Sequence, residues 1–319
     1  MKRIGILTSG GDAPGMNAAV RAVARKALSS KLEVCGINYG YKGLVEGNIF
    51  EIKEKEVSDL IQLGGTTLYT ARYPEFAEKE YQLKGIEQLK KHGIDALVTI
   101  GGDGSYHGAV RLTEQGYNAI GLPGTIDNDI PFTDRTIGFD TAIQTSVEEI
   151  DKVRDTAKSH GRIFVVEVMG RNSGEIALRT AIASGSQAVI IPEKPFDVDE
   201  IAGIVKDARR RGHEHQIIIT AEGAIHAQDL TDQLANRGID NIRGVALGHV
   251  VRGGAPTASD RVLASRMGSY AVDLLLDGQG GQAVGIEKGV ITHHSMLDLF
   301  DSKAKTDLSM YDLANTLSY

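Results

Sequence analysis

Apolar and polar positions follow one repeated order along the chain: a short β-branched run, a glycine-rich turn, and then a helical pattern. The apolar runs predict buried strands, and the i, i+3, i+7 spacing of Val20, Val23 and Ala27 predicts the first helix. We expect strands at residues 3–8, 33–39, 95–100, 118–122, 162–169, 188–192, 215–221 and 245–251. We expect helices at residues 17–28, from the turn at 101–105 to about 114, at 141–159 and at 260–276.

Strands that are apolar throughout and alternate with helices indicate parallel sheets covered on both faces. The chain holds enough such units for two sheets, so the expected fold class is α/β with two domains. No internal repeat and no Pro/Ser-rich linker marks a boundary, and the pattern restarts near residue 140.

Composition narrows the class of protein further. The net charge of −7 disfavours nucleic-acid binding. The single cysteine, Cys35, excludes an intrachain disulfide and a cysteine zinc site. No run of about 20 apolar residues predicts a membrane span, and the apolar run after Arg3 is too short for a signal peptide, so we expect no membrane association and a cytoplasmic location. The 38 glycines, about 12% against a typical ~7%, gather in turns that follow the strands.

The first glycine turn runs from Gly10 to Asn17. Gly10 and Gly15 have P-loop spacing, but Met16 and Asn17 stand where that motif has Lys-Ser/Thr, which excludes a Walker A site. The turn can still present amides to a phosphate at a helix N-terminus, or it is a plain tight turn.

The second turn, residues 101–105, contains Asp103 and departs from the dinucleotide fingerprint. A carboxylate here would repel a bare phosphate, but it suits Mg²⁺, which binds one or two carboxylates together with phosphate oxygens. The alternative is Asp103 as a helix N-cap.

The third turn, residues 123–129, places Thr125, Asp127 and Asp129 two residues apart, on one face of an extended segment. A base, a metal ligand and a hydroxyl donor could line this wall, and the alternative is an Asx-rich surface turn. Five arginines adjoin glycines or strand ends, which favours a small anionic substrate: Arg72, Arg162, Arg171, Arg243 and Arg252. Together these residues predict magnesium–nucleotide phosphoryl transfer to a phosphorylated acceptor.

Seven sequence blocks, in order along nearly the whole chain, resemble the bacterial ATP-dependent 6-phosphofructokinase family: TSGGDAPGMN (8–17), IGGDGS (100–105), PGTIDNDI (123–130), TIGFDTA (136–142), EVMGR (167–171), AEG (221–223) and GHVVRGGAPTASDR (248–261). The resemblance implies two Rossmann-like three-layer domains with mainly parallel sheets, and a homotetramer. It implies a larger ATP-binding domain of residues 1–138 plus 251–301 and a smaller fructose 6-phosphate-binding domain of residues 139–250 plus 302–319.

The resemblance also implies roles for individual residues. It assigns ATP to Gly11, Arg72, Tyr73, Gly102, Asp103, Gly104 and Ser105, with Mg²⁺ on Asp103 and Asp129. It assigns fructose 6-phosphate to Thr125, Ile126, Asp127, Met169, Gly170, Arg171, Glu222, His249, Val250, Val251 and Arg252, and to Arg162 and Arg243 from a neighbouring subunit. Catalysis would involve Asp127 as the base, with Thr125, Arg72, Gly11 and Arg171. His249 on its own could equally be a core histidine.

An effector site for ADP or phosphoenolpyruvate is implied at Arg21, Arg25, Glu54, Asp59, Arg154, Gly185, Ser186, Gln187, Arg211, His213, Glu214 and His215. Three positions depart from the family pattern: Glu54 replaces a basic residue, Gln187 a glutamate, and His213 a lysine. Losing two cations and gaining an anion predicts weakened regulation, since each charged contact contributes ~1.5–3 kcal/mol.

Four alternatives compete with this function. Pyrophosphate-dependent relatives carry Asp and Lys where Gly104 and Gly124 stand, which favours ATP here. A non-catalytic nucleotide sensor should have lost Asp103 or Asp127, and both are present. A GGDG-type kinase acting on NAD or a lipid should lack the third turn together with the GHVVRGG block. An NAD-dependent oxidoreductase should carry G-x-G-x-x-G, which is absent.

Overall fold

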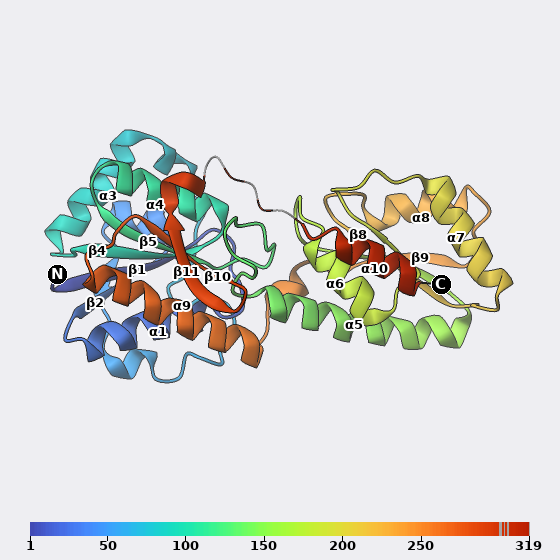
Figure 1. The fold of residues 1–319 in the computed structure, drawn as a ribbon, viewed down its shortest axis with the longest axis horizontal. Helices are drawn as coiled ribbons and strands as arrows, with labels where there is room; N and C mark the ends of the chain where they lie inside the picture. The colour runs from blue at the N-terminus through green and yellow to red at the C-terminus, as the bar shows by residue number, and fades with distance from the viewer. Residues whose placement is uncertain (300–301, 303, 305, 319) are drawn as a thin grey trace. The chain divides into compact units, whose positions relative to one another are not determined.

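The computed structural model describes residues 1–299, 302, 304 and 306–318. The chain divides into two units, one formed by Met1–Asp140 with Arg252–Ala304 and the other by Thr141–Val251 with Lys305–Tyr319. In Figure 1 the first unit holds the blue and cyan segments and helix α9, and the second holds the yellow ones. Each unit has its own sheet, as the restart of the pattern near residue 140 predicts.

The described part of the first unit contains a seven-stranded sheet in the order β11-β10-β5-β4-β1-β2-β3. Its strands are β1 (Arg3–Ser9), β2 (Glu33–Ile37), β3 (Ile49–Glu51), β4 (Ala96–Gly101), β5 (Asn118–Pro123), β10 (Gln282–Glu287) and β11 (Val290–Ser295). Strands β1, β2, β4, β5 and β10 pair in parallel, and the edge strands β3 and β11 are antiparallel to their neighbours. Strand β4 is buried along its whole length, because helices cover both faces.

The helices of this unit are α1 (Met16–Ser29), α2 (Gly40–Glu46), α3 (Lys79–Lys91), α4 (Asp103–Glu114) and α9 (Ala258–Leu276), with 3-10 turns η1 (Glu54–Val57), η2 (Pro74–Ala77) and η4 (Met296–Leu299). Helices α1 and α9 pack together on one face of the sheet, and α3 and α4 lie on the other (Figure 1). Gly268 permits the close α1–α9 contact, since an added Cβ would lie 2.8 Å from the Cβ of Ala22. In β2, burial raises the pKa of the Cys35 thiol.

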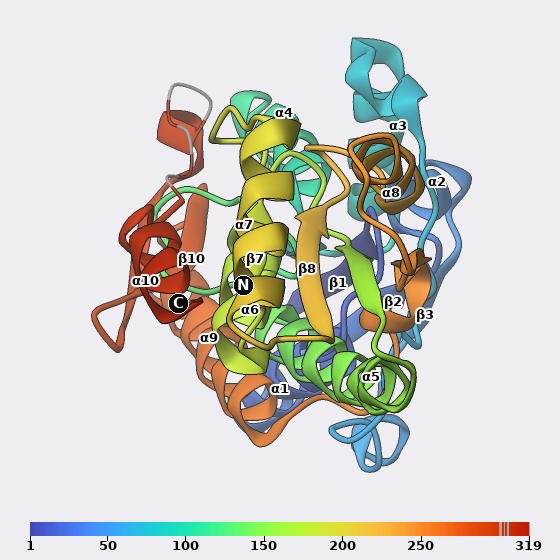
Figure 2. The ribbon, with the colours of Figure 1, turned by 90° about the vertical axis from the view of Figure 1, so that its right-hand side faces the viewer.

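The described part of the second unit holds a four-stranded parallel sheet in the order β7-β8-β6-β9. Its strands are β6 (Ile163–Val168), β7 (Ala188–Ile190), β8 (Gln216–Ala221) and β9 (Ile242–Ala246). Its helices are α6 (Glu175–Ser184), α7 (Val198–Arg210), α8 (Ala227–Ala235), α10 (Ser309–Leu317) and most of α5 (Phe139–His160), and the 3-10 turn η3 (Gly248–Arg252) ends at the unit boundary. Isoleucine, valine and leucine side chains of α7 and α8 form one core with the sheet, and α10 packs beside α6 (Figure 2).

The strand predicted at residues 245–251 is wrong. Strand β9 covers Ile242–Ala246, and the chain then turns into η3. Gly248 has φ 58°, a left-handed conformation that cannot continue a strand. The hairpin of β10 and β11 was not predicted, although Lys288 and Gly289 both have positive φ at its two-residue turn.

None of the helices in the described ranges combines the length and the apolar content that crossing a membrane requires.

Candidate functional site

The first glycine turn joins β1 to α1, and Gly10 and Gly15 have the positive φ angles that the turn needs, 82° and 103°. Gly15 is the N-cap of the helix and has no side chain to bond the amides of its first turn. The guanidinium of Arg252 covers this turn: its Nη2 donates to the Asp12 carbonyl (2.8 Å) and its Nε lies 3.4 Å from the Asp12 carboxylate. An added Cβ on Gly11 would lie 1.8 Å from that Nη2, so a larger residue there would displace the Arg252 guanidinium from the turn.

The second turn follows β4 directly. Gly102, rather than Asp103, is the N-cap of α4, so the alternative role of Asp103 as a cap is not observed. The Asp103 side chain is 65% exposed, and its Oδ2 lies 3.4 Å from Nε2 of His107. Ser105 is buried, and its hydroxyl has no hydrogen-bond partner among the described residues. An added Cβ at Gly104 would meet nothing within 4 Å, which leaves open space beside Asp103.

The third turn lies against the second, because β4 and β5 are neighbours and end together. The Gly124 amide donates to the Gly101 carbonyl (3.0 Å), and a Cβ on Gly102 would lie 3.4 Å from the Cβ of Thr125. Asp127 is 6% exposed, and its amide donates to the Thr125 hydroxyl (3.2 Å). Ile126 is buried beside it. Burial of these groups is not what the surface-turn alternative predicts.

Strands β5, β4 and β1 stand in that order in the sheet, so the three turns form a continuous edge at the carboxyl ends of parallel strands. Open α/β sheets bind their ligands at this edge. Asn17, which the sequence analysis did not single out, attaches the loop that leads to Arg72: its amide donates to the carbonyls of Leu63 and Gly64, and its oxygen accepts from the Thr67 amide.

Arg72 and Tyr73 come at the end of that loop. Arg72 is exposed, and it forms no ion pair or hydrogen bond with another described residue, so its guanidinium is available to an anion. The Tyr73 ring packs edge-on against Tyr81, and burial raises the pKa of its phenol.

In the second unit, Met169, Gly170 and Arg171 follow β6, and Glu222 follows the neighbouring strand β8. The Glu222 carboxylate accepts from the amides of Gly170 (3.2 Å) and Arg171 (2.9 Å), which joins the two loops. His249 and Val250 are exposed on η3 beyond β9, and Val251 is buried there. The structure therefore gathers these residues at the carboxyl ends of the strands of the smaller sheet.

Arg162 and Arg243 lie at the other end of the strands of that sheet, their amino ends. Arg162 precedes β6, and Arg243 pairs with Phe164 near the amino end of the same strand. At ~3.3 Å of rise per residue, the strand separates them from Met169 by roughly 17–23 Å. Within one unit the structure does not bring them to the loops that carry Arg171 and Glu222.

The positions assigned to an effector fall into two groups. In the second unit a cavity of about 330 Å³ is lined by Arg154, Gly185, Gln187, His213 and His215, together with Gly212, Gln216 and Ile217. Ser186 is buried nearby, and Glu214 is exposed. In the first unit, Arg21 and Arg25 lie on α1, and Glu54 and Asp59 lie at or beyond η1. Arg25 forms an ion pair with Glu54 (3.2 Å), so one of the two arginine charges is already compensated.

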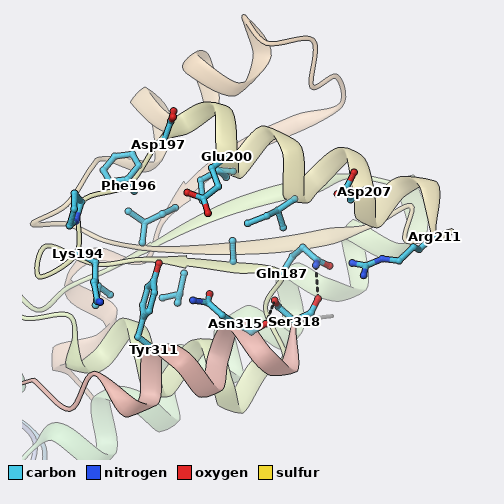
Figure 3. A pocket seen from close by; sticks show the side chains of 17 residues that line it. Gln187, Lys194, Phe196, Asp197, Glu200, Asp207, Arg211, Tyr311, Asn315 and Ser318 are labelled. Atoms are coloured by element: carbon cyan, nitrogen blue, oxygen red, sulfur yellow. Dashed lines mark hydrogen bonds between the residues drawn. The ribbon is translucent and has the colours of Figure 1, made fainter.

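A second cavity, of about 410 Å³, lies between α7 and α10 over the edge strand β7 (Figure 3). Arg211 lines this cavity rather than the first, and Gln187 lines both. The Gln187 amide donates to the Ser318 carbonyl (2.7 Å), which a glutamate could not do in its ionised form. The wall of this second cavity combines Lys194 and Arg211 with Asp197, Glu200 and Asp207, so it carries both positive and negative side chains.

Mg²⁺ needs few protein ligands when phosphate oxygens complete its coordination. No group of three or more metal-binding side chains occurs among the described residues, and Asp103 and Asp129 each contribute one carboxylate to the carboxyl edge of the first sheet. The exposed Asp103 and the open space at Gly104 fit an ion that arrives with a nucleotide, and they do not fit a preformed cage.

Fold and site together define a two-unit α/β protein with glycine-rich turns at the carboxyl ends of its strands. The sequence pattern of the family described as Phosphofructokinase matches residues 3–275, so the chain belongs to the phosphofructokinase family. It is 62% identical over 319 residues, 100% of both chains, to the ATP-dependent 6-phosphofructokinase of Lacticaseibacillus casei (strain BL23). It is 62% identical over 322 residues, again 100% of both chains, to the protein of that name from Pediococcus pentosaceus.

Solved structures agree with this assignment. Phosphofructokinase from Saccharomyces cerevisiae superposes with a TM-score of 0.88 at 36% identity, over 94% of this chain and 45% of that one. A pyrophosphate-dependent phosphofructokinase from Marinobacter aquaeolei gives a TM-score of 0.86 over 97% of this chain and 86% of that one. At 22% identity, that second likeness shows the fold alone.

Proposed function

We propose that this protein is an ATP-dependent 6-phosphofructokinase, a glycolytic phosphotransferase that moves the γ-phosphoryl group of ATP to the 1-hydroxyl of fructose 6-phosphate. The observation that carries the proposal is the contact between the second and third turns, which brings the loops of Asp103 and Asp127 together at the ends of β4 and β5. The full-length identity to relatives with this name supports it.

Asp127 is the proposed base. A carboxylate with an ordinary pKa of ~3.9 is far weaker than an alkoxide, so it orients the sugar hydroxyl and takes its proton late, as a loose phosphoryl-transfer transition state permits. Its low exposure removes competing water. The Thr125 hydroxyl, the Gly11 amide and the guanidinium of Arg72 hold the charge of the moving phosphoryl group, and Arg171 binds the sugar phosphate. Mg²⁺, held by Asp103 and Asp129, would neutralise phosphate charge when bound.

ATP is the proposed donor because glycine occupies two decisive positions. The space at Gly104 is open, so it can admit a nucleotide that an aspartate would crowd and repel. A Cβ on Gly124 would lie 3.0 Å from a methyl of Ile100 and 3.2 Å from the Met16 methyl, so a lysine there would require rearrangement. The other proposed ATP contacts are Tyr73, Gly102 and Ser105.

We assign ATP to the larger domain, residues 1–138 plus 251–301, and the sugar phosphate mainly to the smaller domain, residues 139–250 plus 302–319. The proposed sugar-phosphate contacts are Met169, Gly170, Glu222, His249, Val250, Val251 and Arg252. Arg162 and Arg243 lie at the amino ends of their strands, away from these loops, which supports the proposal that a neighbouring copy supplies them. The proposed assembly is the homotetramer that the family resemblance implies. The proposed location is the cytoplasm.

Regulation by ADP or phosphoenolpyruvate is proposed to be weak. Glu54 already pairs with Arg25, and the Gln187 amide is bonded to the Ser318 carbonyl, so neither position offers the charge that a phosphorylated effector or its metal needs.

A coupled assay with fructose 6-phosphate, ATP and Mg²⁺ tests the whole proposal. Turnover should require all three components, pyrophosphate should not replace ATP, and effectors should change the rate little. A protein that binds ATP but shows no turnover would instead support the nucleotide-sensor alternative.

A further inference from the structure

Asn128 stands between Asp127 and Asp129, and its backbone is in the left-handed region with φ 51°. Asparagine is one of the few residues other than glycine that adopts this conformation readily. The conformation turns the chain sharply between the two carboxylates, and the backbone alone does not explain why asparagine rather than glycine is found there.

The Asn128 side chain uses both ends of its amide. Its Oδ1 accepts from the Thr136 amide (2.9 Å), and its Nδ2 donates to the Asp134 carbonyl (3.3 Å). Thr136, which is fully buried, donates its hydroxyl to the Thr125 carbonyl (2.6 Å). Thr136 is therefore bonded to both ends of the segment from Thr125 to Asn128, which carries Asp127.

Asp134, the other partner of the Asn128 side chain, is attached to the β10–β11 hairpin. The Asp134 amide donates to the Ile286 carbonyl (2.7 Å), and the Asp134 carboxylate accepts from the Lys288 amide (2.6 Å). Thr133 accepts from the Ile286 amide (3.1 Å). Asn128 thus connects the third turn to a fixed element of the sheet.

We propose that Asn128 is a positioning residue that holds the Asp127 carboxylate in the orientation needed to receive the sugar proton. This inference rests on the proposed phosphofructokinase function and adds to it a residue that touches no substrate. An asparagine is required because one side chain must both accept and donate. Glycine would keep the backbone conformation and lose both bonds, whereas aspartate would keep the acceptor and place an oxygen against the Asp134 carbonyl.

Asn128→Gly tests the inference with the backbone conformation preserved. A displacement of about 1 Å in a catalytic group costs up to ~10²-fold in rate, so we expect kcat to fall ~10–10²-fold. The KM for both substrates and the Kd for ATP should stay within about threefold, because only orientation in the transition state changes. The kcat of Asn128→Asp should lie between that of Asn128→Gly and that of the wild type, because the aspartate keeps one of the two hydrogen bonds.

Asn241→Gly is the matched control. Asn241 also has a left-handed backbone (φ 55°), and its Nδ2 donates to the carbonyls of His160 (3.1 Å) and Gly161 (2.9 Å), but it lies in the other unit. At saturating substrate its kcat should remain within about twofold of wild type, although its thermal midpoint should drop about as much as that of Asn128→Gly.

A kcat of Asn128→Gly within about threefold of wild type, or a loss no larger than that of Asn241→Gly, would overturn the inference. So would an equal rise in KM for both substrates, which indicates general disorder. If Asn128→Gly does not fold, the same kcat criterion applies to Asn128→Asp. Absence of activity in the wild type would instead refute the proposed function, so the two failures are distinguishable.

Discussion

The substitution Gly104→Asp should weaken ATP binding without lowering the stability of the fold. The glycine is the second residue of α4, and an added Cβ would meet nothing within 4 Å. The folded state should therefore accept the side chain, and an acidic residue in the first turn of a helix adds ~0.3–1 kcal/mol of stability. If ATP phosphates lie here, a new carboxylate ~6 Å away would oppose each phosphate charge by about 0.7–3 kcal/mol, for an effective dielectric constant between ~80 and ~20.

That repulsion corresponds to an ATP KM raised about 3- to 100-fold for each opposing charge. The assay is ATP-dependent turnover at fixed Mg²⁺, with thermal unfolding measured on the same sample. Gly203→Asp is the matched control, because Gly203 lies within α7, has open space at its Cβ and belongs to the second unit. An unchanged ATP KM in a folded Gly104→Asp protein would refute the placement of the nucleotide beside Asp103.

Asp127→Ser should lower kcat by ~10²–10⁴-fold and leave substrate affinities within an order of magnitude, and unchanged turnover would remove Asp127 from the mechanism. Chelation of Mg²⁺ with EDTA should abolish turnover, and added Mg²⁺ should restore it; activity in EDTA would contradict the metal assignment. Gln187→Glu should lose the bond to the Ser318 carbonyl and lower the thermal midpoint measured by calorimetry. An unchanged midpoint would show that this bond contributes nothing to stability. The hydrogen bond and charge of Glu167 raise the pKa of His226, so their pairing stabilises the protein below the unfolded pKa of histidine and is lost as pH rises through the folded value. In urea titrations, the change in unfolding free energy caused by His226→Asn should therefore be more destabilising at pH 6 than at pH 9; equal effects at both values would exclude the pairing.

The sequence predicts the parts of the site that depend on local chemistry. The three glycine turns follow predicted strands, and parallel strands end at a common edge, so Gly11, Asp103 and Asp127 could be placed near one another before the structure. The same reasoning predicts α/β units and the restart near residue 140. These features depend on spacing over a few residues, which a single sequence displays directly.

The remaining features depend on contacts between distant segments. Arg252 reaches Asp12 across 240 positions, and no local pattern pairs them. The sequence predicts the third turn either as a wall of functional groups or as an Asx-rich surface turn, and neither prediction includes the bonds of Asn128 to Thr136 and Asp134. The sequence does contain one sign of the left-handed conformation of Asn128, because asparagine adopts this backbone more readily than most residues and here stands between two aspartates. The hairpin of β10 and β11 escaped prediction because His293 and its neighbours in β11 are only half-buried and lack a clear apolar alternation.

The burial of Cys35 has a practical consequence for spectroscopy. Because this thiol is the only one in the chain and its pKa is raised, maleimide reagents at neutral pH should leave the native protein unlabelled. A cysteine introduced at an exposed position such as Leu83 on α3, which is 50% exposed, would then carry a single fluorophore with no need to replace the natural residue.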